Sequence, residues 1–345
     1  MLQLVNLTQM ASERALLTGV DGQHVLVVVI KATFDLAQGA APVMSAVQEP
    51  VVKTPLYLGD DPKATLLRDL ELTLDHPGTD VVVNGSAHAP GGKMVSEVLA
   101  GVTVGPVSDR VRVTGPRVWV RGLTGVVPDA PEPFTRMPII YENAWGGGQE
   151  TAKGPIWDER NPAGSGFAAD PAQLLGQPAP TVEDPDDPVG RATARTVTPV
   201  AGFAAQPVTW FPRRGMGGTY DEHWQNTRMP FWPDDVQPGF FRVATPALQS
   251  PKTLRGHEPV SLRNLTPDGE MAFRIPRVIP TVRTMVAGRW VQQEVNMRRI
   301  IIEPDLGKLV LMWRAVYPCG ADGRKITRIS VDQKRIVRAD AQAAA

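Results

Sequence analysis

The stretch that decides the fold is Val25-Leu-Val-Val-Val-Ile-Lys-Ala-Thr-Phe-Asp-Leu36. Its density of β-branched residues is typical of a buried strand, and Asp21-Gly22 just before it is a turn signal. Similar runs, separated by Pro- and Gly-containing turns, recur towards both ends of the chain. Further strands are expected at 80–85, 94–104, 110–114, 259–263, 271–275, 290–303 and 308–317. We therefore predict a mainly β protein whose antiparallel sheets form a sandwich or a barrel.

The composition excludes several classes of protein. The chain has 33 Pro and 32 Gly among 345 residues, about 19%, compared with a usual combined share of about 12%. So many helix-breaking residues exclude a coiled coil or a helical bundle. A hydrophobic share of 42% is too high for a disordered tail. Lys plus Arg and Asp plus Glu each number 36, and a chain without net charge lacks the basic surface of a general nucleic-acid binder.

Other features predict a soluble, cytoplasmic protein. The first residues contain no basic region followed by an apolar stretch, so no signal peptide is expected. The longest purely aliphatic run, Val25 to Ile30, is far shorter than the roughly 20 residues that span a membrane, so no membrane insertion is expected. Cys319 is the single cysteine, which excludes a disulfide framework and a cysteine-rich zinc site. We expect Cys319 to be a small buried residue.

The chain is expected to form one integrated domain with three regions and a tail. These are an N-terminal β region at 1–130, an irregular region at 131–255, a C-terminal β region at 256–333 and a tail at 334–345. The irregular region is rich in Pro and Gly yet holds most of the Trp and Phe residues. We therefore expect an ordered segment with few short helices, whose aromatic side chains pack on the β core. A terminal helix is expected over 331–345.

Two local signals stand out in the irregular region. The acidic and Pro-rich stretch Pro178–Pro188 predicts a mobile loop. Thr219-Tyr-Asp-Glu222 fits a capping box, with Thr219 as the N-cap and Glu222 at the N3 position. A short helix is expected to follow through Gln225 and to end before Pro230.

Standard catalytic signatures are missing from the sequence. It contains no phosphate-binding glycine loop, no G-x-S-x-G nucleophile elbow and no H-E-x-x-H zinc motif. No two of the five histidines lie at i and i+4, so we expect no metal, and we expect no cofactor. His223 lies beside Asp221 and Glu222, which could tune it as a general base. Acidic residues at a helix start produce the same pattern, and this structural interpretation is preferred.

Polar side chains set among Gly, Pro and aromatic residues form the densest local signatures of the chain. They could meet in one network that ties the irregular region to the β core or takes part in partner binding. A buried charge there would need a partner, and Arg213 with Glu142 or Asp221 is the natural pair. The candidate residues of this structural or partner-binding network are Tyr141, Glu142, Asn161, Arg213, Tyr220, Asp221 and Trp224.

Five stretches are distinctive as a set. They are Val27-Val-Val-Ile-Lys-Ala-Thr-Phe34, Thr79-Asp-Val-Val-Val-Asn-Gly85, Val113-Thr-Gly-Pro-Arg-Val-Trp119, Asn161-Pro-Ala-Gly-Ser-Gly-Phe167 and Leu254-Arg-Gly-His-Glu258. Together they resemble the bacterial family called domain of unknown function 2169, over about residues 1–320. Two positions depart from the family's pattern. Trp145 stands where Phe is usual, and Pro116 replaces a frequent acidic residue, which weakens the expectation of a local ion pair at Arg117.

The resemblance implies an accessory protein of the bacterial type VI secretion system. It implies an adaptor or chaperone that holds a secreted effector or its PAAR-like carrier in the cytoplasm and helps to load it onto the VgrG spike. The spike protein is a further partner, and no catalytic residue is implied, so we expect no enzyme. The residues leave two alternatives open. One is a hydrolase with Glu142, Asp221 and His223 as acid–base groups, and the other is a fixed scaffold of the secretion apparatus.

Overall fold

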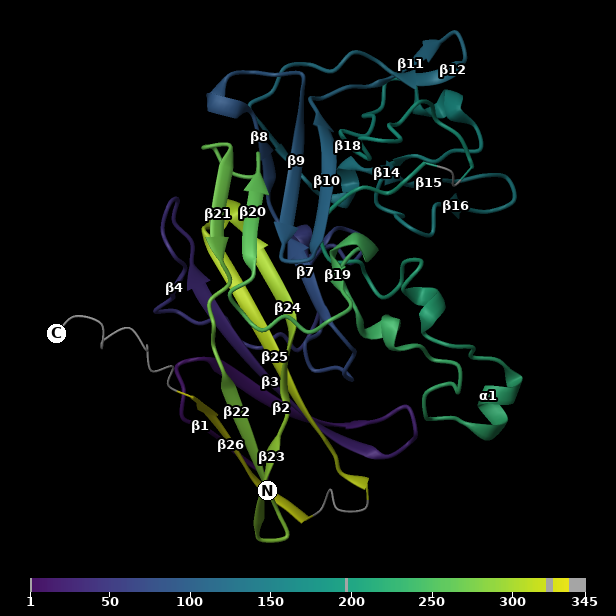
Figure 1. Ribbon diagram of the computed structural model, residues 1–345. Helices are drawn as coiled ribbons and strands as arrows, with labels where there is room; N and C mark the ends of the chain where they lie inside the picture. The colour runs from purple at the N-terminus through teal and green to yellow at the C-terminus, as the bar shows by residue number, and fades with distance from the viewer. Residues whose placement is uncertain (1, 196–197, 321–324, 335–345) are drawn as a thin grey trace, which may run out of the picture.

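The largest sheet has seven strands and contains the stretch predicted first (Figure 1). The computed structural model describes residues 2–195, 198–320 and 325–334. The strand order is β19-β7-β24-β25-β3-β2, with β4 paired to the end of β3, and every pair is antiparallel except β7–β24. The strands are β2 (Ala11–Thr18), β3 (His24–Asp35), β4 (Val43–Met44), β7 (Thr79–Val83), β19 (Gln249–Ser250), β24 (Val295–Glu303) and β25 (Lys308–Pro318). Both ends of the chain therefore contribute to one sheet.

Two further sheets complete the body of the protein. The five-stranded sheet has the order β18-β10-β9-β20-β21, and the four-stranded sheet has the order β1-β26-β22-β23. Their strands are β18 (Val182–Glu183), β10 (Val107–Thr114), β9 (Glu97–Val104), β20 (Pro259–Arg263), β21 (Glu270–Arg274), β1 (Gln3–Asn6), β26 (Ile326–Gln333), β22 (Pro280–Val286) and β23 (Arg289–Gln293). The prediction of a mainly β protein is confirmed, and the open sheets fit its sandwich form.

Two expectations for chain segments are wrong. The start of the expected terminal helix lies in β26, which pairs with β22 and, in parallel, with β1; the rest, 335–345, lies outside the described residues. The stretch 178–188 contains the strand β18, and Glu183 within it is 1% exposed. Pairing with distant strands decides both cases, because local composition carries no information about a partner at the other end of the chain.

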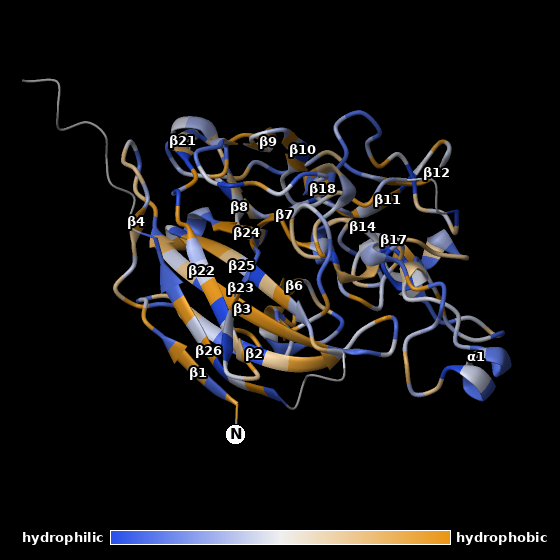
Figure 2. Ribbon diagram, turned by 60° about the horizontal axis from the view of Figure 1, so that its bottom comes forward, coloured by the Kyte–Doolittle hydropathy of each residue, from blue (hydrophilic) through white to orange (hydrophobic). Residues whose placement is uncertain are grey.

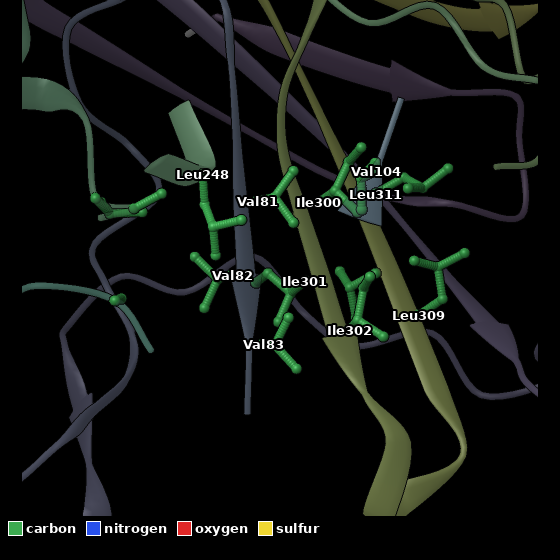
Figure 3. Packing of buried hydrophobic residues seen from close by; sticks show 14 of the residues in the cluster. Val81, Val82, Val83, Val104, Leu248, Ile300, Ile301, Ile302, Leu309 and Leu311 are labelled. Carbon is green, nitrogen blue, oxygen red and sulfur yellow. The ribbon is translucent and has the colours of Figure 1, made fainter. Parts of the chain in front are cut away.

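The central strands β3 and β25 of the seven-stranded sheet are buried on both faces, which explains their long apolar runs. Val82 lies beside Leu248 on one side of β7, whereas Val81 and Val83 lie on the other side (Figure 3). The main core contains the inward residues of the five-stranded sheet, including Val104. The two sheets therefore pack over one large apolar core, as expected for a sandwich.

The irregular region is ordered by small strand ladders. Its strands and those that pair near it are β5 (Leu56–Tyr57), β6 (Leu66–Arg68), β8 (Ser86–His88), β11 (Trp119–Gly122), β12 (Gly125–Pro128), β13 (Arg136–Pro138), β14 (Trp145–Gly146), β15 (Gly148–Gln149), β16 (Ile156–Trp157) and β17 (Ser165–Gly166). Trp119, Trp145 and Phe167 form a separate apolar cluster, and Trp210 packs on Tyr141 in another. These aromatic side chains thus build satellite cores beside the main one.

Helices are short in the described residues. The α-helix α1 comprises Glu222–Thr227, and it ends before Pro230 as expected. Its N-cap is Asp221, not Thr219, because the hydroxyl of Thr219 donates to Asp235 instead. The 3₁₀ helices are η1 (Leu58–Asp60), η2 (Pro90–Gly92), η3 (Tyr141–Asn143), η4 (Pro171–Leu174), η5 (Arg214–Met216), η6 (Pro238–Phe241), η7 (Pro246–Leu248) and η8 (Pro304–Leu306). None of the helices in these ranges has the length and apolar content to cross a bilayer.

Candidate functional site

Two of the predicted network residues, Tyr141 and Glu142, meet around Thr65. The carboxylate of Glu142 accepts hydrogen bonds from the backbone N–H of Thr65, at 2.8 Å, and from its hydroxyl. The same hydroxyl oxygen accepts from the N–H of Tyr141 at 2.8 Å. The hydroxyl of the buried Tyr141 donates to the carbonyl of Ala204 at 2.9 Å. This group of contacts connects η3 to β6 and to the segment after residue 200.

Asn161 is joined to this group through the backbone of Tyr141. Its fully buried side-chain amide donates to the carbonyl oxygens of Tyr141, at 2.8 Å, and Trp145, at 2.9 Å. Gly146 packs directly on it: a Cβ at Gly146 would lie 2.1 Å from the carbonyl oxygen of Asn161, and its φ is 150°. The glycine is therefore required by a close approach of two backbone segments.

Arg213 does not join Glu142 or Asp221, so the predicted ion pair is wrong. Its guanidinium forms an ion pair with Asp69 at 2.7 Å and donates to the carbonyl oxygens of Phe240 and Gln206, both at 2.8 Å. Burial, opposed by Asp69, lowers the pKa of Arg213. The sequence interpretation was right that this arginine is buried and paired, and it assigned the wrong partner.

Tyr220, Asp221 and Trp224 lie elsewhere, in an arm that we define as residues 218–236. This arm carries α1 and projects from one side of the protein in two views (Figures 1 and 2). The carboxylate of Asp221 accepts a hydrogen bond from the backbone N–H of Trp224 at 2.9 Å. The rings of Tyr220 and Trp224 pack edge to face, with their centroids 4.8 Å apart. The seven predicted residues therefore form one central group and one peripheral group, with Arg213 in a third set of contacts.

The arm is fastened to the hairpin between β2 and β3. Arg228 donates to the carbonyl of Val20 at 2.8 Å, and the indole of Trp232 donates to the carbonyl of Thr18 at 3.3 Å. The ring of Phe231 lies over Gly22, where an added Cβ would be 3.7 Å from it. Backbone carbonyls of a hairpin thus hold a segment that has little regular secondary structure of its own.

The arm exposes three large apolar side chains. Tyr220 is 54% exposed, Met229 63% and Phe231 41%. Their backbone is constrained by the contacts above and by the indole of Trp224, which donates to the carbonyl of Phe231 at 2.9 Å. Exposed apolar side chains on a constrained segment are typical of protein-binding surfaces.

The acid–base group of the hydrolase hypothesis is split by this arrangement. Glu142 is bound to Thr65 in the central group, whereas Asp221 caps α1 and His223 is an exposed residue of the same helix. No contact joins Glu142 to either of them in the described part of the chain. Within the same residues, no cluster of His, Cys, Asp and Glu side chains could hold a metal ion.

A buried layer of charges on the seven-stranded sheet is the site feature that sequence reasoning missed. One row of residues in register crosses four strands: Lys31 on β3, Met312 on β25, Arg299 on β24 and Asp80 on β7. The three charged members of the row are at most 2% exposed. Segments before β7 and after residue 200 cover this face, and they supply most of the partner charges.

The ion pairs of this layer join the sheet to its covering segments. Lys31 pairs with Glu71 at 2.9 Å, and Asp80 pairs with Arg242 at 2.8 Å. The complete set of pairs is Lys31–Glu71, Lys31–Glu49, Arg68–Glu49, Arg68–Glu303, Arg213–Asp69, Arg242–Asp80, Arg298–Asp75 and Arg314–Asp75. A charged residue within an apolar run, such as Lys31, was the available signal, because a buried charge requires a partner.

His76 and Arg314 in this layer have strongly lowered pKa values. Burial lowers the pKa of His76 to about 4, and the charges of Arg314 and Arg299 add to the effect while Asp80 opposes it. Burial also lowers the pKa of Arg314 to about 10, with Asp75 opposing and Arg299 and Arg298 adding. In both cases burial is the main cause, and neighbouring arginines add a smaller effect in the same direction.

A second buried charge group lies at the five-stranded sheet. Glu183 on β18 pairs with Arg112 at 2.5 Å and with Arg117 at 2.8 Å, and it accepts from the N–H of Val189 at 2.8 Å. Arg117 thus has an ion pair in spite of Pro116, with a partner 66 residues away along the chain. Pro116 therefore removes only an acidic neighbour of Arg117 in the sequence, and the ion pair of Arg117 is formed with the distant Glu183 instead.

The comparisons with known proteins give one match. No curated protein and no solved structure matches the chain. The family described as "Uncharacterized protein conserved in bacteria (DUF2169)" matches residues 21–314, a range that includes the seven-stranded sheet from β3 to most of β25, the Thr65 contacts and the arm. Because this match covers most of the sequence, the chain belongs to that bacterial family.

Proposed function

We propose that this protein is an adaptor that binds a second polypeptide through the arm at residues 218–236. The proposed partner is a type VI secretion effector or its PAAR-like carrier, held in the cytoplasm before it is loaded onto the spike. The partner class comes from the resemblance of the sequence to the domain of unknown function 2169 family. The binding surface comes from the geometry of the arm.

The observation that carries the proposal is that Tyr220, Met229 and Phe231 are exposed on a segment whose backbone is held in place by hydrogen bonds. A flexible loop would lose conformational entropy on binding, whereas a segment already held by hydrogen bonds loses little. Aromatic side chains contribute most of the binding energy at many protein interfaces, and methionine adapts to irregular partner surfaces. The arm therefore offers a compact apolar anchor.

The base of the arm is rigid as well. The rings of Trp232, Phe240 and Phe241 stack edge to face at 5.4–5.7 Å, and Phe241 is buried. Arg242 follows directly and pairs with Asp80 of the seven-stranded sheet. The apolar anchor is thus connected to the centre of the fold by a short chain of packed residues.

The test is binding to the products of the neighbouring genes. The full chain is co-expressed with the adjacent effector and PAAR-like proteins, and complexes are separated by size-exclusion chromatography. Affinity for a co-eluting protein is then measured by calorimetry with the variant Met229→Ser/Phe231→Ser. We expect this variant to bind at least about tenfold more weakly, since truncating an anchor at an interface commonly costs about 2 kcal/mol.

Leu123→Ser is the matched control, because Leu123 is fully exposed and lies in the turn between β11 and β12, away from the arm. It should bind like the unmodified protein. Equal affinity of the arm variant would refute the arm as the binding surface. If neither neighbouring protein co-elutes at micromolar concentration and effector export is unchanged on deletion, the adaptor function is refuted. Binding only to a fixed spike component would identify a scaffold instead.

A further inference from the structure

Arg299 occupies an unusual position in the buried charge layer. It lies near the centre of β24, opposite Asp80 on β7 and Met312 on β25. Its side chain is 2% exposed. A guanidinium removed from water to this extent ordinarily has carboxylate or carbonyl partners, because the energetic cost of burying an unpaired charge is several kcal/mol.

Arg299 has no such partner in the described residues. No carboxylate lies within ion-pair distance of it, no oxygen accepts a hydrogen bond from its guanidinium, and its Nε is fully buried. The nearest acidic residue in register, Asp80, directs its carboxylate elsewhere. One oxygen accepts from Arg242 Nε at 2.8 Å, and the other accepts from the N–H of Val243 at 2.6 Å.

The surroundings of Arg299 are positive. Its charge contributes to the lowered pKa of His76, Arg213 and Arg314, after the larger effect of burial in each case. Six of the seven cations in the layer have carboxylate partners among six acidic residues, and Arg299 is the seventh. The described layer therefore has an excess of one buried positive charge.

We propose that Arg299 binds one small inorganic anion of halide size, which neutralises the buried charge layer. The covered position of the guanidinium favours a small anion, because a larger polyatomic anion such as phosphate would have to be buried together with it. The site lies on the covered face of the sheet, at β24, and faces the segments before β7 and after residue 200.

Arg314 supplies a second donor to this site. It lies two residues beyond Met312 on β25, so it is the diagonal neighbour of Arg299 on the same face of the sheet. Its two terminal nitrogens donate to the carbonyl oxygens of Leu74 and Glu71, both at 2.9 Å, whereas its buried Nε has no acceptor. The Nε–H groups of two arginines on neighbouring strands thus both lack an acceptor.

His76 is not a ligand of this anion. Its Nδ1 lies 3.1 Å from the carbonyl oxygen of Pro77, so this nitrogen carries the proton of the neutral ring. The Nε2 then has a lone pair and cannot donate to an anion, and it has no hydrogen-bond partner. His76 is therefore excluded as a donor to the anion.

The first experiment uses bromide as the probe, because it replaces chloride and scatters anomalously. Crystals of the full chain are grown in sodium bromide, and an anomalous difference map is calculated at the bromine edge. We expect one internal peak in contact with the guanidinium of Arg299. Peaks on surface residues alone would identify an adventitious ion only, and they would overturn the proposal.

The second experiment measures thermal unfolding in sodium chloride and in sodium gluconate at equal ionic strength. Gluconate is too large for the site. An anion that binds only the folded protein raises its melting temperature, by about 2 °C or more when it is present in large excess over its dissociation constant. We expect this increase for the unmodified protein and expect Arg299→Met to abolish it.

Arg283→Met is the control, because Arg283 is an exposed arginine that lies over the ring of Trp290. It should keep the chloride-dependent increase. In gluconate, Arg299→Met should be at least as stable as the unmodified protein, since an apolar side chain of similar volume removes an uncompensated charge. An equal chloride effect in the Arg299→Met protein would overturn the proposal. Both experiments use the isolated chain, so their outcome is independent of any adaptor function.

Discussion

His76 makes the stability of this protein depend on pH in a defined window. Its pKa is about 4 in the folded protein, compared with an ordinary value of 6.5, because it is buried among arginines. Between about pH 6.5 and pH 4 the histidine is therefore neutral in the folded protein and takes up a proton on unfolding. Its contribution to stability is complete above this value and is lost as the pH falls towards 4.

The size of this effect follows from the two pKa values. Between pH 7 and pH 5 the unfolded histidine becomes almost fully protonated while the folded one stays neutral. The resulting loss in the free energy of unfolding is about 2 kcal/mol at pH 5. We expect His76→Gln to remove this pH-dependent loss, although the substitution changes the stability at pH 7 by an amount that depends on packing.

The assay is urea unfolding of the unmodified and His76→Gln proteins at pH 7, 6 and 5. For each protein, the change in the free energy of unfolding between these pH values is determined, and the two changes are compared. This comparison cancels the contribution of Asp109, whose pKa is raised by burial to about 6 and which therefore has the opposite pH dependence. His223→Gln is the control, because His223 is exposed on α1. Equal pH dependence in the His76→Gln and unmodified proteins would refute the reasoning.

Three further predictions concern stability. Glu183→Gln, which leaves the buried Arg117 without its carboxylate, should cost about 3–5 kcal/mol in urea unfolding, whereas Asp186→Asn, at an exposed ion pair, should cost at most about 1 kcal/mol; similar costs would contradict the buried pair. Gly146→Ala should prevent accumulation of folded protein, judged by near-ultraviolet circular dichroism, while Gly190→Ala, with open space around it, should fold normally. Asp109→Asn should raise the melting temperature at pH 7 and keep only about half of this advantage at pH 5, because burial raises the pKa of the carboxyl to about 6 and its unfolded pKa is 3.8; an advantage that is equal at both pH values would show that this carboxyl does not cause it.

The strands were predictable where a single segment carries enough information. The run at 25–36 becomes β3, which extends over His24–Asp35, because dense β-branched residues favour a strand buried on both faces. Leu306-Gly307 lies between β24 and β25, and Gly307 there has a φ of 60°, as a turn glycine commonly has. The turn at Asp268-Gly269 likewise joins β20 to β21.

Partners distant in sequence were not predictable. Arg213 pairs with Asp69, 144 positions earlier in the numbering, and Arg117 pairs with Glu183. A single sequence shows that a buried arginine needs an acidic partner, but with 36 acidic residues it does not show which one. For the same reason the aromatic residues were expected to pack on the main core, and several of them form satellite clusters instead.

The buried charge layer explains how a segment with little secondary structure is held in one arrangement. Apolar packing is non-directional, so an apolar cover would have several positions of similar energy on the flat face of a sheet. Lys31–Glu71, Arg298–Asp75 and Asp80–Arg242 each join a strand to a covering segment at one position. Any displacement of the cover would break these pairs and leave charges buried without partners, at several kcal/mol each. Because Arg242 follows the base of the arm, this layer fixes the direction in which the arm presents its exposed side chains.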